Sequence, residues 1–166
     1  MSKPVKIILI VCGVLAVCTI PVLLILLTLA VPAMQQVTIR ARETSAMESL
    51  RVLNSAEAEY AAAYPDRGFA CTLGTLGGGP ASGPPTADAA QIIGDDLVSG
   101  DKAGYTFVIS NCTKKTADNH DQFVSYKIVA VPHSVGHTGN RGFCTDETTV
   151  IHFDPKGGTN CTELLQ

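Results

Sequence analysis

The chain has 166 residues, of which 46% are hydrophobic and 16% are charged, with six cysteines, no tryptophan and a formal net charge of −3. This length suits one domain of ordinary size and excludes two large lobes. The acidic balance argues against a nucleic-acid-binding protein, because contacts with phosphates need clustered lysine and arginine side chains. We therefore expect no nucleic-acid partner.

Charge is distributed unevenly along the chain. No charged residue lies between Lys6 and Arg40, and all fifteen acids follow Gln36. Without Lys3 and Lys6, the downstream part carries ten bases against fifteen acids, a net charge of −5. This pattern indicates an apolar stalk attached to an acidic body that faces water.

Residues 7–33 form an almost unbroken apolar stretch of 27 residues. As a helix it would span about 40 Å, against roughly 30 Å for the hydrocarbon core of a bilayer. The polar stripe that a helix buried in a soluble protein would show is not visible. We therefore predict a transmembrane segment over residues 1–34, with the lipid bilayer as a partner.

The flanking charges predict the orientation of this segment. Lys3 and Lys6 favour a cytoplasmic N-terminus, whereas Arg40 and Arg42 oppose it. The charges that precede the first hydrophobic segment usually determine its orientation. We expect a single-pass protein of the inner membrane with a periplasmic or extracellular body. A cleaved signal peptide, with a mature chain that starts near Met34, is the alternative; the apolar stretch is about twice the length of an ordinary signal core, so we favour a retained anchor.

Residues 35–64 are predicted to form an amphipathic helical spine. This segment has no glycine or proline, and the next residue, Pro65, is expected to end the helix. Apolar residues recur on one face at spacings of three, four or seven; they are Ile39, Ala46, Leu50, Leu53, Tyr60 and Tyr64. Most charged residues, Glu43 among them, are expected elsewhere. The apolar face could cover a sheet as the first helix of a domain, or pack against copies of itself as a polymerising spine.

Residues 65–166 are predicted to form a globular, β-rich head. A loop rich in glycine and proline covers residues 77–85, and residues 87–97 favour a short helix. Runs rich in β-branched and aromatic residues predict three strands, at residues 105–110, 123–131 and 148–153. With few crossover helices between them, these strands favour an antiparallel sheet. The fold class is therefore α+β, with the long N-terminal helix packed on a small antiparallel sheet.

The six cysteines divide into two groups. Cys12 and Cys18 lie in the apolar segment, where packing is the expected role. The remaining four are Cys71, Cys112, Cys144 and Cys161. An even number of cysteines in an oxidising compartment predicts two disulfides, and of three possible pairings we favour Cys71–Cys112 with Cys144–Cys161. Zinc is the rival use, but no two of these cysteines have C-x2-C spacing.

No group of residues predicts catalysis. His133 and His137 are four apart, but the surrounding glycines and proline favour a loop over a helical metal site. Asp95 and Asp96 are adjacent and point apart, so they make a poor acid–base pair. We find no serine-nucleophile motif and no phosphate-binding loop. The sequence therefore predicts no enzyme activity, no cofactor and no metal.

A series of short motifs follows the apolar segment in a characteristic order. They are Ala-Val-Pro at 30–32, Arg-Ala-Arg-Glu-Thr-Ser-Ala-Met-Glu-Ser-Leu-Arg at 40–51, Asn-Ser-Ala-Glu at 54–57, Tyr-Pro at 64–65, Gly-Phe-Ala at 68–70, Leu-Gly-Thr-Leu-Gly at 73–77, Ser-Gly at 99–100, Gly-Tyr-Thr-Phe at 104–107 and Thr-Asp-Glu-Thr-Thr-Val-Ile at 145–151. In this order and spacing the chain resembles a type IV pilin or a type II secretion pseudopilin of bacteria. The resemblance implies a long N-terminal spine, a C-terminal antiparallel sheet and assembly into a filament through spine packing. It also implies a C-terminal disulfide loop, which fits Cys144 and Cys161.

The chain departs from this family at its N-terminus. Family precursors are cut after a glycine that precedes a Phe-rich helix with a glutamate at its fifth position, whereas here Gly13 is followed by Val14, and Cys18 occupies that position. The departure favours a membrane-resident, accessory pilin-like protein. We therefore expect a structural subunit that associates through its helix with other pilin-like subunits, as a homo- or hetero-oligomer, or with the pilus or secretion machinery. The alternative is a membrane-anchored, extracytoplasmic binding module that presents loops 77–85 or 133–142 to a ligand.

Overall fold

The computed structural model describes the backbone of residues 3–78, 83–117 and 120–165, and the side chains of these residues except 3, 6–33 and 117. The chain forms two compact units, Met1–Thr38 and Ile39–Gln166, and we call the second one the globular unit. Among the residues described, no helix is long and apolar enough to cross a membrane. The predicted transmembrane segment, with Cys12 and Cys18, lies almost entirely on residues whose side chains are outside this description.

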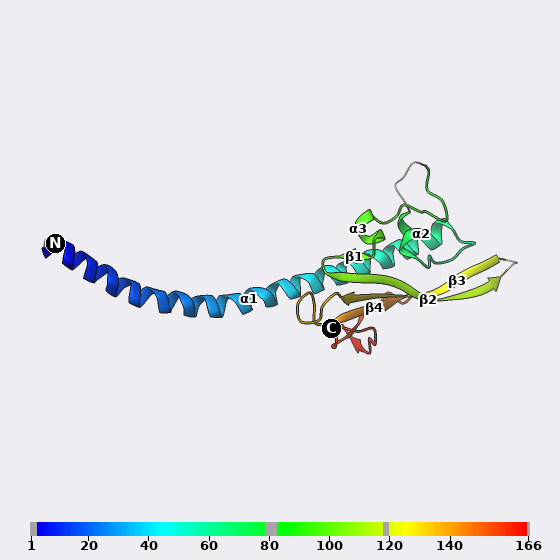
Figure 1. The fold of residues 1–166 in the computed structure, drawn as a ribbon. Coiled ribbons are helices and arrows are strands. Elements are labelled where there is room, and N and C mark those ends of the chain that lie inside the picture. The colour runs from blue at the N-terminus through cyan, green and yellow to red at the C-terminus, as the bar shows by residue number, and fades with distance from the viewer. Residues whose placement is uncertain (1–2, 79–82, 118–119, 166) are drawn as a thin grey trace. The chain divides into compact units, whose positions relative to one another are not determined.

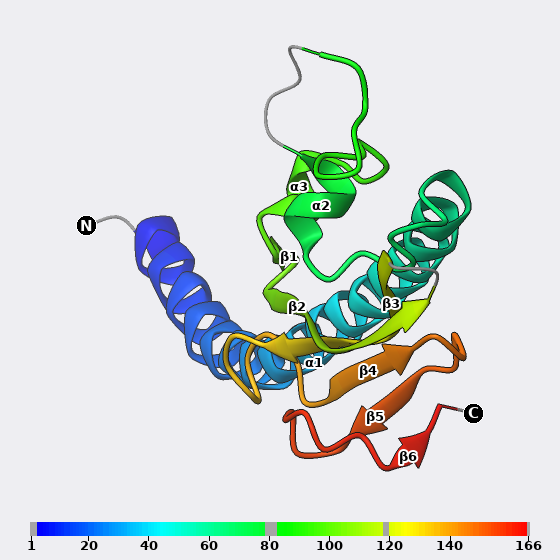
Figure 2. The same cartoon turned by 90° about the vertical axis from the view of Figure 1, so that its right-hand side faces the viewer.

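Helix α1 (Lys3–Ala63) supplies the first element of the globular unit. Its residues 39–63 lie along one face of the sheet (Figures 1 and 2). The helix ends where the sequence predicts, because Tyr64 precedes a proline and such a residue avoids the helical region. The Tyr64 N–H still donates to the Tyr60 carbonyl oxygen at 2.8 Å and closes the last turn.

The six strands form one antiparallel sheet in chain order. They are β1 (Asp101–Lys102), β2 (Tyr105–Ala117), β3 (His120–Pro132), β4 (Gly142–Asp146), β5 (His152–Asp154) and β6 (Glu163–Leu164). Each strand pairs only with its neighbours in sequence, so the sheet is a meander, as Figure 2 shows from β2 to β6. Short loops suffice to connect antiparallel neighbours, which explains why so little helix lies between the strands.

The two long strands, β2 and β3, are interrupted by an irregularity in their register. The regular pairing breaks between Ser110 and Thr113, where Asn111 has a φ of 52°. Asparagine tolerates this left-handed conformation better than most residues. The irregularity brings Cys112 into the disulfide with Cys71.

Two short helices, α2 (Leu73–Gly77) and α3 (Asp95–Val98), pack beside the sheet. The predicted helix over residues 87–97 is therefore wrong except for its last residues. Gln91 has a φ of 55°, and its N–H donates to the Gly77 carbonyl oxygen at 2.9 Å. Hydrogen bonds to α2 thus replace the bonds that a helix would make within residues 87–94.

The strand predictions hold for the first two runs and only in part for the third. Residues 105–110 and 123–131 lie in β2 and β3, which extend further than predicted. Of the third run, 148–153, only His152 and Phe153 lie in a strand, β5. Its first residues follow a turn instead, which the Thr149 N–H closes by donating to the Asp146 carbonyl oxygen at 2.9 Å. Strand β4 was not predicted, because its sequence, Gly-Phe-Cys-Thr-Asp, contains only one aromatic and one β-branched residue.

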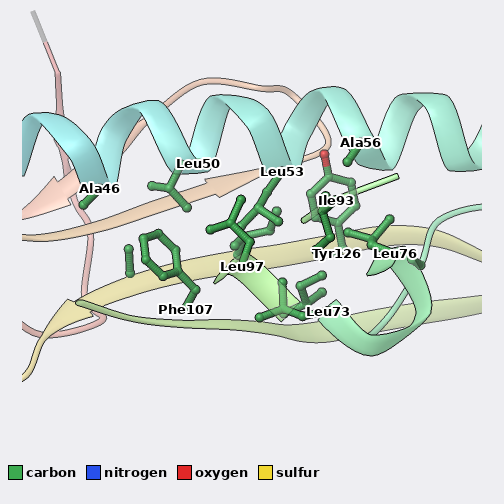
Figure 3. Packing of buried hydrophobic residues seen from close by; sticks show 14 of the residues in the cluster. Ala46, Leu50, Leu53, Ala56, Leu73, Leu76, Ile93, Leu97, Phe107 and Tyr126 are labelled. Carbon is green, nitrogen blue, oxygen red and sulfur yellow. The ribbon is translucent and has the colours of Figure 1, made fainter. Parts of the chain in front are cut away.

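The core lies between α1 and the sheet. In Figure 3, Leu50 and Leu53 of α1 approach Phe107 of β2 and the side chains that α2 and α3 contribute. The largest fully buried apolar side chains are Tyr105, Phe107, Phe143, Leu50, Leu53, Leu76 and Ile128. Burying one such side chain contributes roughly 1.5–3 kcal/mol. The α+β arrangement of one long helix on an antiparallel sheet therefore has a single core.

Candidate interaction surfaces

The apolar face that the sequence singles out on the spine points into the globular unit. Ile39, Ala46, Leu50, Leu53 and Tyr60 are all buried, and Tyr64 packs at the margin of the same cluster. This burial favours the interpretation of the segment as a domain helix that covers the sheet. The same side chains cannot also pack against another subunit while the globular unit is folded.

The opposite side of α1 is exposed to solvent, and we call it the outer face. Its residues are Arg40, Ala41, Thr44, Glu48, Arg51, Val52, Ser55, Ala58, Glu59 and Ala62. Val52 is the large apolar residue of this face and is 50% exposed, while Arg51 and Glu48 form an ion pair beside it. The outer face mixes small, charged and apolar side chains, so within residues 39–63 it is the side of the helix that is free to contact a partner.

An ion pair between a buried carboxylate and a partly exposed arginine fixes the start of α1 in the globular unit to the sheet. Glu43 Oε2 accepts hydrogen bonds from Arg141 Nε at 2.9 Å and Nη2 at 2.7 Å, and the Glu43 side chain is only 5% exposed. Its Oε1 accepts from the backbone N–H groups of Asn140 and Arg141. The Arg141 guanidinium also lies over the rings of Phe143 and Phe153.

The prediction that Glu43 lies off the apolar face is therefore wrong. Glu43 is three residues from Ala46 and seven from Leu50, so it shares their side of the helix. The spacing itself was the available signal. It was overlooked because a charged residue is assigned to solvent unless a partner is known, and Arg141 lies 98 residues away in sequence.

A second buried polar group joins the middle of α1 to strands β3 and β4. Asn54 Nδ2 donates to Thr145 Oγ1 at 2.8 Å, and the Tyr126 hydroxyl donates to Asn54 Oδ1 at 3.2 Å. Buried polar groups of this kind stabilise a fold only when they are satisfied. The three side chains therefore specify how the helix is placed along the sheet.

Glu57 is a third polar residue on the inner side of the helix and is fully buried. Its Oε2 accepts a hydrogen bond from the Ala70 N–H at 2.7 Å, while its Oε1 has no hydrogen-bond partner within the described part of the chain. Burial raises the pKa of Glu57 to about 8, although the bond from Ala70 acts in the opposite direction. A carboxyl group in this setting is mostly protonated at neutral pH.

The structure contains two disulfides, Cys71–Cys112 and Cys144–Cys161, in the pairing that we favoured from the sequence. The second bond ties the segment before β6 to β4, and nearby Lys127 Nζ donates to the Thr159 carbonyl oxygen at 3.3 Å. Disulfides persist in oxidising compartments. The globular unit is therefore typical of an extracytoplasmic protein.

The histidines are dispersed over the globular unit. His133 Nε2 lies 2.9 Å from Asp101 Oδ1, whereas the backbone carbonyl oxygen of His137 accepts from Arg42 Nη1 at 3.1 Å. In the residues that the structure describes, no three side chains of histidine, cysteine, aspartate or glutamate are grouped so that they could hold a metal ion. Asp118, which the sequence places near His120, is outside that description.

One cavity lies between the end of α1 and the region around α2. It has a volume of about 210 Å³, and its lining includes Tyr60, Arg67, Phe69, Asp88 and Phe123. Arg67 Nη2 lies 3.5 Å from Asp88 Oδ1. The cavity therefore combines aromatic rings with one charge of each sign, which is typical of a ligand site.

Comparison of the chain with protein-family models, with curated proteins and with solved structures found no match in any of the three. The arrangement itself, a long N-terminal helix packed on a six-stranded antiparallel sheet with two disulfides, is consistent with a pilin-like fold.

Proposed function

We propose that this protein is a structural, pilin-like subunit anchored in the inner membrane by its N-terminal segment. In this role the N-terminal helix associates with other pilin-fold subunits or with the pilus or secretion assembly machinery. The role is structural and involves no catalytic step. The resemblance of the ordered motifs from Ala30 to Ile151 supports this assignment.

The observation that carries the proposal is the division of α1 into two sides. Its inner side is buried against the sheet, whereas its outer face remains exposed over residues 40–62. A helix that only completed a domain could end with that domain, but α1 extends N-terminally as far as Lys3. A helix that is shared between a core and a free face suits a subunit whose neighbours pack along it.

The experiment is a charge substitution on the outer face. Val52→Glu should reduce assembly, measured by chemical cross-linking of membrane preparations and by electron microscopy of surface fibres, because it adds a carboxylate to the contact. Val108 of β2 is 45% exposed on the sheet, so Val108→Glu is the matched control. Both variants should keep the thermal unfolding midpoint of the wild type.

Leu50 and Leu53 are unsuitable as test residues for assembly. Substituting Leu50 or Leu53 by a charged residue would unfold the globular unit, since both are fully buried. Loss of assembly in those variants would not separate a packing role from a folding role. Equal assembly of the wild type, Val52→Glu and Val108→Glu would contradict the proposal.

The alternative function is a membrane-anchored, extracytoplasmic binding module. The cavity lined by Tyr60, Phe69 and Phe123 favours it, because ligand sites combine apolar walls with a few polar groups. A monomeric full-length protein whose unfolding midpoint rises with a small aromatic ligand would support this role. Loss of that rise in Phe69→Ala, with unchanged behaviour of Val52→Glu, would locate the ligand in the cavity.

A further inference from the structure

Three segments meet where the chain enters the globular unit at Ile39. They are the adjoining part of α1, the loop at residues 133–139 and the turn at residues 155–157. Arg42 Nη1 donates to the His137 carbonyl oxygen at 3.1 Å, which ties the loop to the helix. A Cβ atom placed on Gly157 would lie 2.6 Å from Val135 Cγ2, so the loop and the turn are in contact.

Val135 is presented at the tip of this loop and is 54% exposed. Its turn is closed by two backbone hydrogen bonds, from the Gly136 N–H to the Gly139 oxygen at 2.9 Å and from the His137 N–H to the Ser134 oxygen at 3.1 Å. Gly136 has a φ of 85°, which glycine adopts readily. An ordered turn therefore holds an apolar side chain out into solvent.

Two cationic residues belong to the segments that meet beside Val135. Arg42 is bonded to the loop that carries Val135, and Lys156 precedes Gly157, which faces Val135; we call these two residues, with Val135 and His137, the entry patch. The nearby acids are engaged: Asp101 pairs with His133, Glu43 with Arg141, and Asp154 accepts from backbone N–H groups. Among the described side chains, Lys156 forms no ion pair.

The positive charge of the entry patch is unusual for the globular unit, which is acidic. The chain from Ile39 onward has ten bases against fifteen acids, a net charge of −5. Exposed acids lie at the other end of the sheet, where Asp121 is the second residue of β3 and pairs with Lys114, and Glu147 follows β4. The register of β3 with β4 places that end opposite Pro132 and the entry patch.

We infer that the entry patch binds an anionic lipid surface, with Val135 inserted among the headgroups and the two cations on lipid phosphates. The inference rests on the proposed function, because it requires the N-terminal segment to be anchored in the bilayer. Arg40 then follows Met34 by six residues, at most about 22 Å of extended chain. Cations near an anionic membrane surface and an apolar side chain that reaches it act together.

The natural sequence provides a clean background for the test. The chain contains no tryptophan, so Val135→Trp, or Ser134→Trp on the same turn, introduces a single fluorescent probe. The full-length protein is placed in nanodiscs whose lipids carry brominated chains, with and without phosphatidylglycerol. Val150→Trp, at a residue that is 42% exposed beyond β4, is the control probe.

We expect brominated lipid to quench Val135→Trp when phosphatidylglycerol is present, and to leave Val150→Trp unquenched. In the Val135→Trp background, Lys156→Gln should weaken the lipid contact about fivefold, since one cation is lost near an anionic surface. Lys115→Gln, at the far end of the sheet, should leave it unchanged. High salt should also weaken the contact, because it screens exposed charges.

Each other outcome overturns the inference in a distinct way. Equal quenching with and without phosphatidylglycerol would exclude recognition of anionic lipid. A change in tryptophan emission that depends on the number of copies per disc, without quenching, would assign the patch to contacts between copies of the chain. Protein that does not remain in the discs would contradict the anchored state, and with it the proposed function. Stable insertion of the protein without quenching of Val135→Trp would overturn only the proposed lipid contact.

Discussion

The Glu57 carboxyl group accepts a hydrogen bond from the backbone N–H of Ala70 at 2.7 Å, inside the core of the globular unit. This bond connects the end of α1 to the residue before Cys71, so it lies next to one of the two disulfides. The other carboxylate oxygen has no partner in the described part of the structure. The hydrogen bond between Glu57 and Ala70 therefore couples the protonation of Glu57 to the packing of the segment that follows α1.

We expect the stability of the globular unit to fall as the pH rises. Burial raises the pKa of Glu57 from 4.5 to about 8, so the folded state binds a proton that the unfolded state has released. The resulting stabilisation is fully present below pH 4.5 and is lost as the pH rises through 8; it amounts to roughly 3–5 kcal/mol. Urea unfolding of the wild type at several pH values between these limits measures it.

Glu57→Gln is the control for this dependence. Glutamine retains an oxygen that can accept from Ala70 and does not titrate, so the variant should show a much flatter profile over the same range. An unchanged profile in Glu57→Gln would assign the pH dependence to other groups.

The ion pair between Glu43 and Arg141 should show strong coupling in a double-mutant cycle. Arg141→Ala leaves a buried carboxylate with fewer partners and should lower the free energy of unfolding by about 3 kcal/mol. Replacing both residues by alanine should cost less than the sum of Glu43→Ala and Arg141→Ala alone. Additive effects of the single substitutions, measured by urea unfolding, would mean that the pair does not act as a unit.

Adjacent positions on α1 should differ sharply in their effect on stability. Leu53→Ala creates a cavity at a fully buried position and should cost about 2–5 kcal/mol. Val52→Ala removes two methyl groups from a half-exposed position and should stay within about 0.5 kcal/mol of the wild type. Similar unfolding midpoints for the two variants would contradict the orientation of the helix.

The two disulfides should contribute similar amounts to stability. Cys71 and Cys112 are 41 residues apart, and Cys144 and Cys161 are 17 apart. Loop closure then predicts losses of about 4 and about 3 kcal/mol when both cysteines of a pair are replaced by alanine. Thermal unfolding of the two double variants measures the losses, and non-reducing peptide mapping checks the pairing. Four free thiols in the native protein would refute both the bonds and the oxidising compartment.

The helix and the two long strands could be predicted from the sequence because their signals are local. Residues 39–63 repeat apolar side chains with a helical period, and Pro65 marks the end. The region from Ala87 to Gly94 could not be predicted in the same way. Its backbone bonds to α2, as in the contact from the Gln91 N–H to the Gly77 oxygen, and this long-range pairing overrides the local preference for helix.

The buried polar residues were the main omission. Glu43 and Glu57 share the spacing of the apolar face, but their partners, Arg141 and the Ala70 N–H, are recognisable only once the chain is folded. Outward exposure at Val135 was equally unpredictable, since a valine in a glycine-rich loop gives no sign of which way it points. The spacing of apolar residues thus predicts helices and strands. Contacts between residues that are distant in sequence determine which side chains are buried and which are exposed.

The first and last strands, β1 and β6, contain only two residues each. Long, unpaired strand edges act as templates for intermolecular hydrogen bonding and for amyloid-like growth. Strand β1 covers only Tyr105 and Thr106 of the 13-residue β2, and among the described residues the only further backbone bond on that outer side is from the Phe107 N–H to the Gly100 oxygen. The outer edge of β2 beyond Phe107 therefore offers main-chain donors and acceptors to a neighbouring chain, so that crowding of copies would add strand pairing to side-chain contacts.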